Sequence, residues 1–165
     1  MKRLVILGAG GYGRTVADVA EQLGYSYTVL DDSIPTQPFS SFIDFVGEDV
    51  EFIPAFGNNE FRLYWCEKIT TAGEKLATLI HTTAYVSPGA SVTSGTVILP
   101  HAVVNTGVII NRGCIINLGA IIDHGCITEE GVHICLGAIV KGENHLPRCI
   151  KIEAGEVVER GQYTL

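Results

Sequence analysis

The sequence predicts an α/β domain followed by a parallel β-helix. Two observations support this prediction: a glycine-rich turn between a strand and a helix near the amino terminus, and a six-residue period of aliphatic residues in the second half. The 165 residues are 47% hydrophobic and 18% charged, so the chain can bury a substantial core. We expect two domains, residues 1–79 and 80–165.

The glycine-rich turn follows a short apolar run. Residues 2–7 are expected to form a buried strand, and a helix is expected from the turn to about residue 23. Gly8, Gly10 and Gly13 fit the pattern G-x-G-x-x-G, in which missing side chains let a phosphate approach the amides of a helix N-terminus. The alternative is that these glycines only allow a close turn between helix and strand.

The rest of the first domain continues the α/β pattern. A second strand, residues 27–30, ends at Asp31 and Asp32, where a dinucleotide-binding fold commonly has the acid that binds ribose. A third strand, 50–56, leads into a second helix, and the segment 33–49 carries no periodic signal. This length holds one mononucleotide-binding half, a half-Rossmann domain, and is too short for the two halves that hold NAD.

The six-residue period begins near residue 80. Thirteen of fourteen positions are aliphatic in the series Ile80, Val86, Val92, Ile98, Val104, Ile110, Ile116, Ile122, Thr128, Ile134, Val140, Leu146, Ile152 and Val158. Two positions before most of these aliphatic residues lies a residue that is usually small. The small residue and the aliphatic residue after it are both expected to point inward from one short strand. After Val140 the small position becomes Asn144, Ile150 and Glu156, so we expect an irregular C-terminal end.

The outward position between two inward residues is also apolar over several repeats. It is occupied by Val97, Val103, Ile109, Ile115, Ile121, Ile127 and Ile139, and His133 interrupts the series. Apolar surface of this extent usually marks an interface, and a three-sided coil offers faces to a threefold neighbour. We therefore predict a homotrimer.

Composition excludes several classes of partner. A formal charge of −7 and a pI near 5.1 argue against binding nucleic acid, which requires a basic surface. No apolar run reaches the ~20 residues that cross a membrane, so no membrane partner and a cytoplasmic location are expected. The five cysteines show no disulfide framework.

The hexapeptide pattern resembles the left-handed β-helix of acyltransferases, in which three hexapeptides make one 18-residue coil. Nearly the whole chain is similar to the sialic acid O-acetyltransferase and UDP-bacillosamine N-acetyltransferase (NeuD/PglD-like) family, in a short form with its own closing strand. The motifs behind this resemblance are Gly8-Ala9-Gly10-Gly11-Tyr12-Gly13, Leu30-Asp31-Asp32, Gly57-Asn58-Asn59-Glu60-Phe61-Arg62, Leu79-Ile80-His81, Ile122-Asp123-His124 and Val132-His133.

The resemblance implies acetyl-CoA-dependent O- or N-acetylation of a nucleotide-activated or sialic-acid-like sugar, for bacterial surface glycans, without a metal. His124 matches the general base, and His133 matches a histidine near acetyl-CoA. Gly142 lies 18 residues after His124, so its amide is expected one coil away, where it could stabilise an oxyanion. The nucleotide-sugar or related acidic sugar would contact Gly8, Gly10, Gly11, Asp31, Asp32, Asn58 and Asn59.

Two departures from the family pattern keep other functions open. Gly125 follows His124 where the family often has an acid, so Asp123 or a carboxylate from elsewhere would orient the base. Many members also have further coils, so the alternative is a non-catalytic nucleotide-sugar-binding or scaffold protein that has lost part of the acyl-CoA groove. A zinc carbonic anhydrase would need His101, His124 and His133 to converge, and their spacing does not predict a ligand triad.

Overall fold

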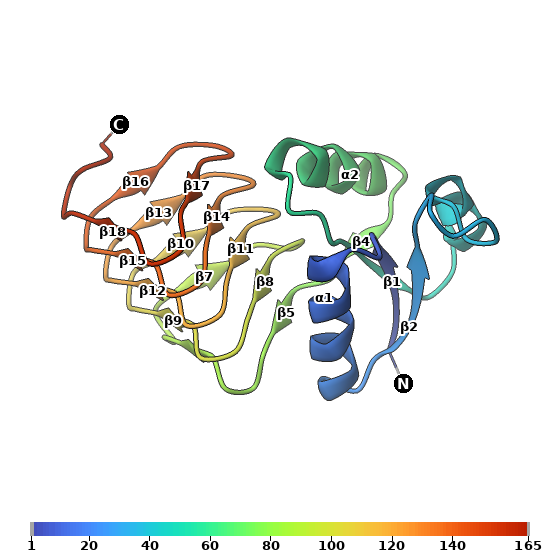
Figure 1. The fold of residues 1–165 in the computed structure, drawn as a ribbon, viewed down its shortest axis with the longest axis horizontal. Helices are drawn as coiled ribbons and strands as arrows, with labels where there is room; N and C mark the ends of the chain where they lie inside the picture. The colour runs from blue at the N-terminus through green and yellow to red at the C-terminus, as the bar shows by residue number, and fades with distance from the viewer. Residues whose placement is uncertain (1, 165) are drawn as a thin grey trace.

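A computed structural model describes residues 2–164 as two parts that lie side by side. Figure 1 shows a three-sided stack of short strands beside an α/β domain, with both main helices next to the stack. This is the half-Rossmann domain followed by a left-handed parallel β-helix that the sequence predicts. In residues 2–164 no helix is long and apolar enough to cross a membrane.

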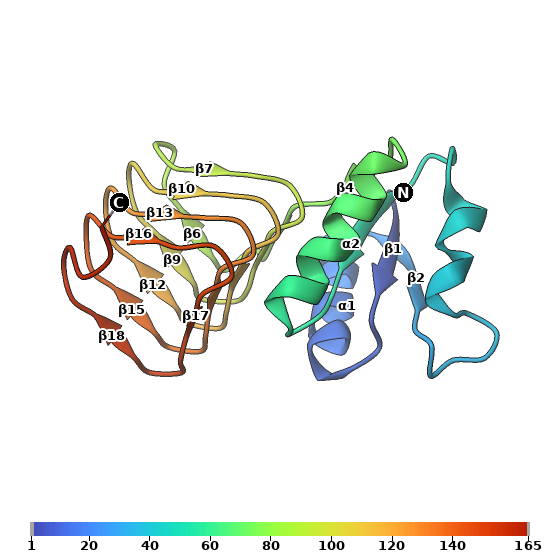
Figure 2. The ribbon, with the colours of Figure 1, turned by 90° about the horizontal axis from the view of Figure 1, so that it is seen from above.

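The α/β domain contains a four-stranded parallel sheet of order β2-β1-β3-β4. Its elements are β1 (Arg3–Leu7), α1 (Gly11–Gln22), β2 (Ser26–Leu30), η1 (Phe39–Phe45), β3 (Glu51–Pro54), α2 (Asn59–Thr71) and β4 (Lys75–Leu76). The segment 33–49 contains the 3₁₀ helix η1, which no periodic pattern in this segment predicts. Figures 1 and 2 both place η1 on the side of the sheet away from the β-helix.

Strand β1 is buried on both faces because helices cover each of them. Leu4 and Ile6 pack with α1 and with the first coil of the β-helix. Val5 and Leu7 point to the opposite face, where η1 and α2 pack. A central parallel strand covered on both sides reads as a continuous apolar run, which is why residues 2–7 were recognisable from sequence.

The β-helix consists of two-residue strands that pair in parallel with strands one coil away. They are β5 (Leu79–Ile80), β6 (Tyr85–Val86), β7 (Ser91–Val92), β8 (Val97–Ile98), β9 (Val103–Val104), β10 (Ile109–Ile110), β11 (Ile115–Ile116), β12 (Ile121–Ile122), β13 (Ile127–Thr128), β14 (His133–Ile134), β15 (Ile139–Val140), β16 (His145–Leu146), β17 (Lys151–Ile152) and β18 (Val157–Val158). They form three faces: the β5 face (β17-β14-β11-β8-β5), the β6 face (β18-β15-β12-β9-β6) and the β7 face (β16-β13-β10-β7).

The six-residue period exists because equivalent residues stack inside the coils. Ile98, Ile116, Ile134 and Ile152 are paired in register on one face and fully buried. Thr128, the one polar member of the series, is buried too, and its hydroxyl lies 3.4 Å from the Cys114 thiol. Its polar group is therefore satisfied without leaving the core.

The expectation of an irregular C-terminal end was wrong as far as Val158. Strands β16, β17 and β18 pair in register with the preceding coil. Asn144 takes the place of the small inward residue because its polar atoms are all bonded. Its side-chain amide donates to the carbonyls of Lys141 and Glu159, and its oxygen accepts from the Tyr163 amide. A buried polar residue is tolerated where its hydrogen bonds are made.

The outward apolar series does not form one exposed surface. Val97, Ile115 and His133 lie on the β5 face and are at most 8% exposed, because the α/β domain lies against that face. The series on the β6 face remains open, with Tyr85 at 55% and Ile121 at 39% exposure. The sequence could not show whether an outward apolar residue contacts the α/β domain of its own chain or a neighbouring subunit, since both contacts produce the same apolar period.

Arg62 joins the two domains at a buried junction. Its side chain is 1% exposed and donates to the carbonyls of Gly113 and Gly131, which lie one coil apart. It also donates to the Phe56 carbonyl and to the side-chain oxygen of Asn59. The guanidinium thus connects the end of β3 with two successive coils.

Candidate functional site

The largest cavity beside the predicted motifs lies at the carboxyl ends of the parallel strands. It has a volume of about 490 Å³ and is lined by Gly8, Gly10, Gly11, Tyr12, Asp31, Ala55, Phe56, Gly57, Asn58 and Phe61. In open α/β sheets ligands bind in the crevice at this edge. Five of the seven predicted substrate residues therefore line one cavity: Gly8, Gly10, Gly11, Asp31 and Asn58.

The glycines of the turn divide into two groups. A side chain at Gly13 would place its Cβ 2.0 Å from the Gly8 carbonyl oxygen, and Gly8 itself has φ +115°. These two glycines therefore permit close packing of α1 on β1. Gly10 and Gly11 have no heavy atom within 4 Å of such a Cβ, so their backbone is open toward the cavity at the start of α1. The turn thus serves packing and leaves room for a phosphate.

Asp31 holds the glycine-rich turn in place. One carboxylate oxygen accepts from the Ala9 amide at 2.7 Å, and the other accepts from the hydroxyl and amide of Ser33 at 2.6 and 2.9 Å. The Ser33 hydroxyl, followed by the Ala9 amide, lowers the pKa of Asp31. Asp32 does not line the cavity, and its carboxylate accepts from the Phe39 amide at the start of η1.

The two asparagines before α2 have different contacts. Asn58 lines the cavity and caps α2, because its side chain accepts from the Phe61 amide. Asn59 instead binds Arg62 and donates to the Cys149 carbonyl of the β-helix, so its side chain is engaged at the domain junction. The roles predicted for Asp32 and Asn59 in substrate binding stay predictions.

Two aromatic residues of the cavity were missed from sequence. Phe56 and Phe61 both line it, with ring centroids 4.6 Å apart. Aromatic faces at such an edge can contact a nucleobase or a sugar ring. Both flank the Gly57-Asn58-Asn59 motif, which was the available signal.

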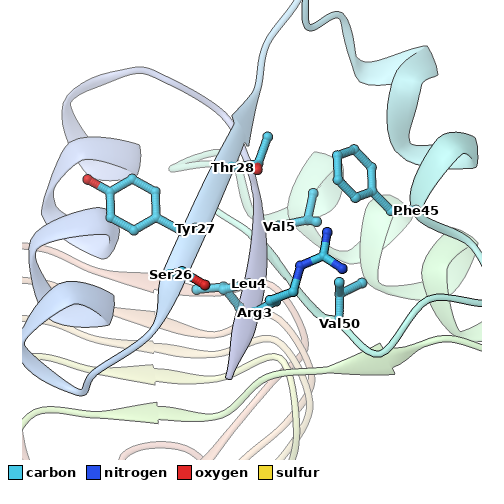
Figure 3. Close-up of a pocket in the computed structure, with 8 residues that line it drawn as sticks. All are labelled: Arg3, Leu4, Val5, Ser26, Tyr27, Thr28, Phe45 and Val50. Carbon is cyan, nitrogen blue, oxygen red and sulfur yellow. The ribbon is translucent and has the colours of Figure 1, made fainter. Parts of the chain in front are cut away.

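A second, smaller cavity lies toward the amino-terminal ends of the same strands. Figure 3 shows it between Arg3, Val50 and Phe45, with Tyr27 on the other side of β2. Its volume is about 80 Å³, and Arg3 forms an ion pair with Glu48 at 2.8 Å. It is too small for a nucleotide and is at the wrong edge of the sheet for this site.

His124 lies in the loop that follows β12, on the corner between the β6 and β7 faces. Its side chain is 48% exposed, and its Nδ1 lies 3.0 Å from Oδ1 of Asp123. Gly142 is one coil away, and a Cβ there would approach Cε1 of His124 to 2.8 Å. The structure thus brings His124 and Gly142 together, and it leaves room for the imidazole only because residue 142 is a glycine.

The Gly142 amide differs from its equivalents in the preceding coils. The amides of Thr106 and His124 are each bonded by the side chain of the preceding residue, Asn105 and Asp123. Gly142 follows a lysine, and no residue among 2–164 accepts its N–H. This donor is therefore free for a ligand beside the imidazole.

His133 lies on β14 of the β5 face, away from the His124 corner, and is 8% exposed. The side-chain oxygen of Asn117 accepts from the Leu118 amide, so its nitrogen faces Nε2 of His133 at 3.0 Å. The proton of a neutral His133 must then be on Nδ1, which is buried without a partner in the described chain. Burial, and then the charges of Arg62 and Lys151, lower the pKa of His133 to about 4.

The depressed pKa of His133 predicts a loss of stability in mild acid. The unfolded chain takes up this proton near pH 6.5 and the folded chain only near pH 4, so stability is full above pH 6.5 and falls between these values. The expected loss is up to about 3 kcal/mol at pH 4. Urea unfolding of the wild type and of His133→Gln across this range measures it. Equal pH dependence in both proteins would contradict the prediction.

A metal site is not formed by the described residues. Within 2–164 no three His, Cys, Asp or Glu side chains are grouped as metal ligands, and this includes His101, His124 and His133.

Comparison with known proteins agrees with this architecture. The PglD N-terminal domain family matches residues 3–69. The acetyltransferase domain of PglB from Neisseria gonorrhoeae FA1090 is 33% identical, with a TM-score of 0.91 over 98% of this chain and 84% of that chain. The chain belongs to the PglD-like acetyltransferase family.

Other relatives of this PglD-like chain extend the comparison. UDP-N-acetylbacillosamine N-acetyltransferase of Bacillus subtilis (strain 168) is 31% identical over 112 residues, which are 60% of this chain and 52% of the relative. The match thus spans about half the length of that curated relative.

The PglB domain is also known in complex with acetyl coenzyme A, at a TM-score of 0.90 and 34% identity, over 98% of this chain and 83% of that chain. GDP-perosamine N-acetyl transferase of Caulobacter crescentus, 22% identical, shares the fold at a TM-score of 0.82, over 98% of this chain and 90% of that chain.

Proposed function

We propose that this protein transfers an acetyl group from acetyl-CoA to a nucleotide-linked sugar. The observation that carries the proposal is the similarity to the PglB acetyltransferase domain over 98% of the chain at 33% identity. That domain has a structure with acetyl coenzyme A, and the curated relative is named for N-acetylation of a UDP-sugar. An amino group is therefore the first acceptor to test, and a hydroxyl group the second.

The α/β domain supports binding of the nucleotide. Its cavity has the open amides of Gly10 and Gly11 at the start of α1, where a diphosphate is favoured by the helix dipole. Asp31 lies at the end of β2, the position that contacts ribose in related folds. Phe56 and Phe61 provide apolar surface for the base or sugar.

The His124 corner supports the chemistry. Nε2 of His124 would take the proton of the sugar amine as its nitrogen attacks the thioester carbon. The new C–N bond forms, the carbonyl oxygen gains negative charge, and the free Gly142 amide would donate to it. Reformation of the carbonyl breaks the C–S bond, and the proton passes from His124 to the leaving thiolate, which gives CoA and the acetamido sugar.

The open β6 face supports a homotrimer. Its outward residues Tyr85, Val103, Ile121, Ile139 and Val157 are stacked in register, and Leu118 and Leu136 extend this surface at the adjoining corner with 38% and 48% exposure. His124 follows β12 of this face, so a neighbouring subunit there would border the site and could complete the acetyl-CoA groove. The role predicted for His133 near acetyl-CoA stays a prediction, because His133 lies on the β5 face. A cytoplasmic location belongs to the same proposal, because acetyl-CoA is its donor.

Two binding titrations and one assay test the proposed activity. We expect saturable calorimetric binding of acetyl-CoA and of at least one member of a panel of UDP- and GDP-linked amino sugars. Mixing the two should release one thiol for each acetamido sugar formed. Binding of a nucleotide sugar without binding of acetyl-CoA would indicate the non-catalytic alternative.

The trimer is tested by its mass in solution. Sedimentation equilibrium should give three times the 17.7 kDa of the chain. Ile121→Arg places an unpaired charge in the β6 face and should yield monomers that remain folded by circular dichroism. Wild-type protein that sediments as a monomer at micromolar concentration would contradict the trimer.

A further inference from the structure

The imidazole of His124 is held by the residue before it. Oδ1 of Asp123 lies 3.0 Å from Nδ1 of His124 and also accepts the His124 backbone amide at 2.7 Å. At this distance a negative carboxylate oxygen repels the lone pair of an unprotonated Nδ1 and attracts an N–H, so the contact favours the tautomer with the proton on Nδ1. Nε2 then keeps its lone pair and points away from the carboxylate.

Asp123 is itself fixed by Asn105, which lies one coil earlier. The side-chain oxygen of Asn105 accepts the Thr106 amide at 2.8 Å, and this bond determines which way its amide group faces. The side-chain nitrogen therefore points to Asp123 and donates to Oδ1 at 3.0 Å. Oδ1 of Asp123 thus accepts two hydrogen bonds, one from the His124 backbone and one from Asn105, and it lies 3.0 Å from Nδ1 of His124.

These donors also determine the charge of Asp123. The His124 amide, followed by the side chains of Asn105 and His124, lowers the pKa of Asp123 to about 2. The carboxylate is therefore ionised at every pH at which an acetyltransferase would be assayed.

Other carboxylates near the corner are less suited to this role. Residue 125, after the histidine, is a glycine with φ +66° and has no side chain to offer. Glu143 lies one coil away, and its two oxygens are bonded by Arg160 at 2.8 and 3.1 Å. Asp123 is thus the carboxylate that contacts the imidazole.

We propose that Asp123 is the positioning residue for His124 and that Asn105 is the positioning residue for Asp123. Together they select the Nδ1–H tautomer of His124 and direct its Nε2 toward the amine of the acceptor sugar. This inference rests on the proposed acetyl transfer for its catalytic consequence. Its structural content, the tautomer of His124, can be measured without any reaction.

The first experiment measures that tautomer. Protein labelled with ¹⁵N in its five histidines is examined by NMR at a pH where His124 is neutral, and the His124 signals are assigned by their loss in His124→Gln. We expect Nδ1–H in the wild type, loss of this preference in Asp123→Ala, and partial loss in Asn105→Ala. Glu143→Gln is the matched control and should retain Nδ1–H. An Nε2–H wild type, or an unchanged tautomer in Asp123→Ala, would overturn the inference.

Kinetics then test the consequence. Asp123→Asn keeps a side-chain oxygen that can accept the His124 backbone amide, as Asn105 accepts the Thr106 amide in its own coil, but it removes the negative charge. This variant should lower kcat about 100-fold or more with little change in KM. Asn105→Ala should lower kcat about 10-fold through loss of one charge-assisted hydrogen bond. Glu143→Gln should leave kcat within about twofold. Equal losses of kcat in Asp123→Asn and Glu143→Gln would contradict the role assigned to Asp123. Absence of acetyl transfer in the wild type would reject the proposed function, but the tautomer measured by NMR would remain valid.

Discussion

Replacement of His124 by glutamine is expected to lower kcat for acetyl transfer by about 10²–10⁴-fold, the usual contribution of a positioned general base. Glutamine has a similar length and can still contact Asp123, but it cannot take a proton from an amine. The side chain is 48% exposed and lies on a corner of the β-helix, so folding should be unaffected. A steady-state assay of thiol release measures the loss.

The distribution of this effect between kinetic constants is part of the prediction. The base acts in the transition state, so both substrates should bind with unchanged calorimetric affinity. His145→Gln is a matched control, because His145 lies on the β7 face and is paired with Glu129. A kcat of His124→Gln within threefold of the wild type would reject His124 as the base.

Replacement of Arg62 by methionine is expected to destabilise the chain by about 4 kcal/mol or more. The substitution leaves the buried carbonyls of Gly113, Gly131 and Phe56 without their donor, and each unsatisfied buried group costs about 1–3 kcal/mol. Burial disfavours the charged guanidinium, which is why it lowers the pKa of Arg62. Removal of this buried charge therefore offsets part of the cost of the substitution. For a domain stable by about 5–15 kcal/mol the remaining loss is large.

Urea unfolding followed by fluorescence of Trp65, the single tryptophan, measures this change. Trp65 lies on α2 one turn after Arg62, is 4% exposed and packs in the core of the α/β domain, so its fluorescence reports the unfolding of that domain. Arg14→Met on the exposed side of α1 serves as the control and should change stability by less than about 0.5 kcal/mol. A loss below about 1 kcal/mol for Arg62→Met would show that the junction does not depend on this side chain.

Several features of the candidate site could be predicted because they depend on local or periodic sequence. Gly8, Gly10 and Gly13 were recognised because a tight strand-to-helix turn requires missing side chains at fixed spacing. His124 and Gly142 were placed together because 18 residues make one coil. Asp31 followed from its position after the second strand.

Other features were inaccessible because their partners are distant in sequence. The contact of Asn59 with the Cys149 carbonyl spans 90 residues, and nothing in the motif around Asn59 indicates it. Phe56 and Phe61 were not predicted as site residues, because only the folded chain brings them beside the glycine-rich turn to line one cavity. Asn144 looked like the end of the repeat because its compensating hydrogen bonds come from residues 141, 159 and 163.

The two-part fold, the coil length and the turn beside α1 could be predicted, because each of them follows from burial or backbone conformation repeated along the chain. How the two parts meet is visible only in the folded chain. Docking of the α/β domain against the β5 face buried Arg62 and covered Val97 and Ile115, and it left the β6 face open for a neighbour. An apolar residue is stabilised by burial against any apolar surface, so only the relative position of the two domains selects the surface that covers it.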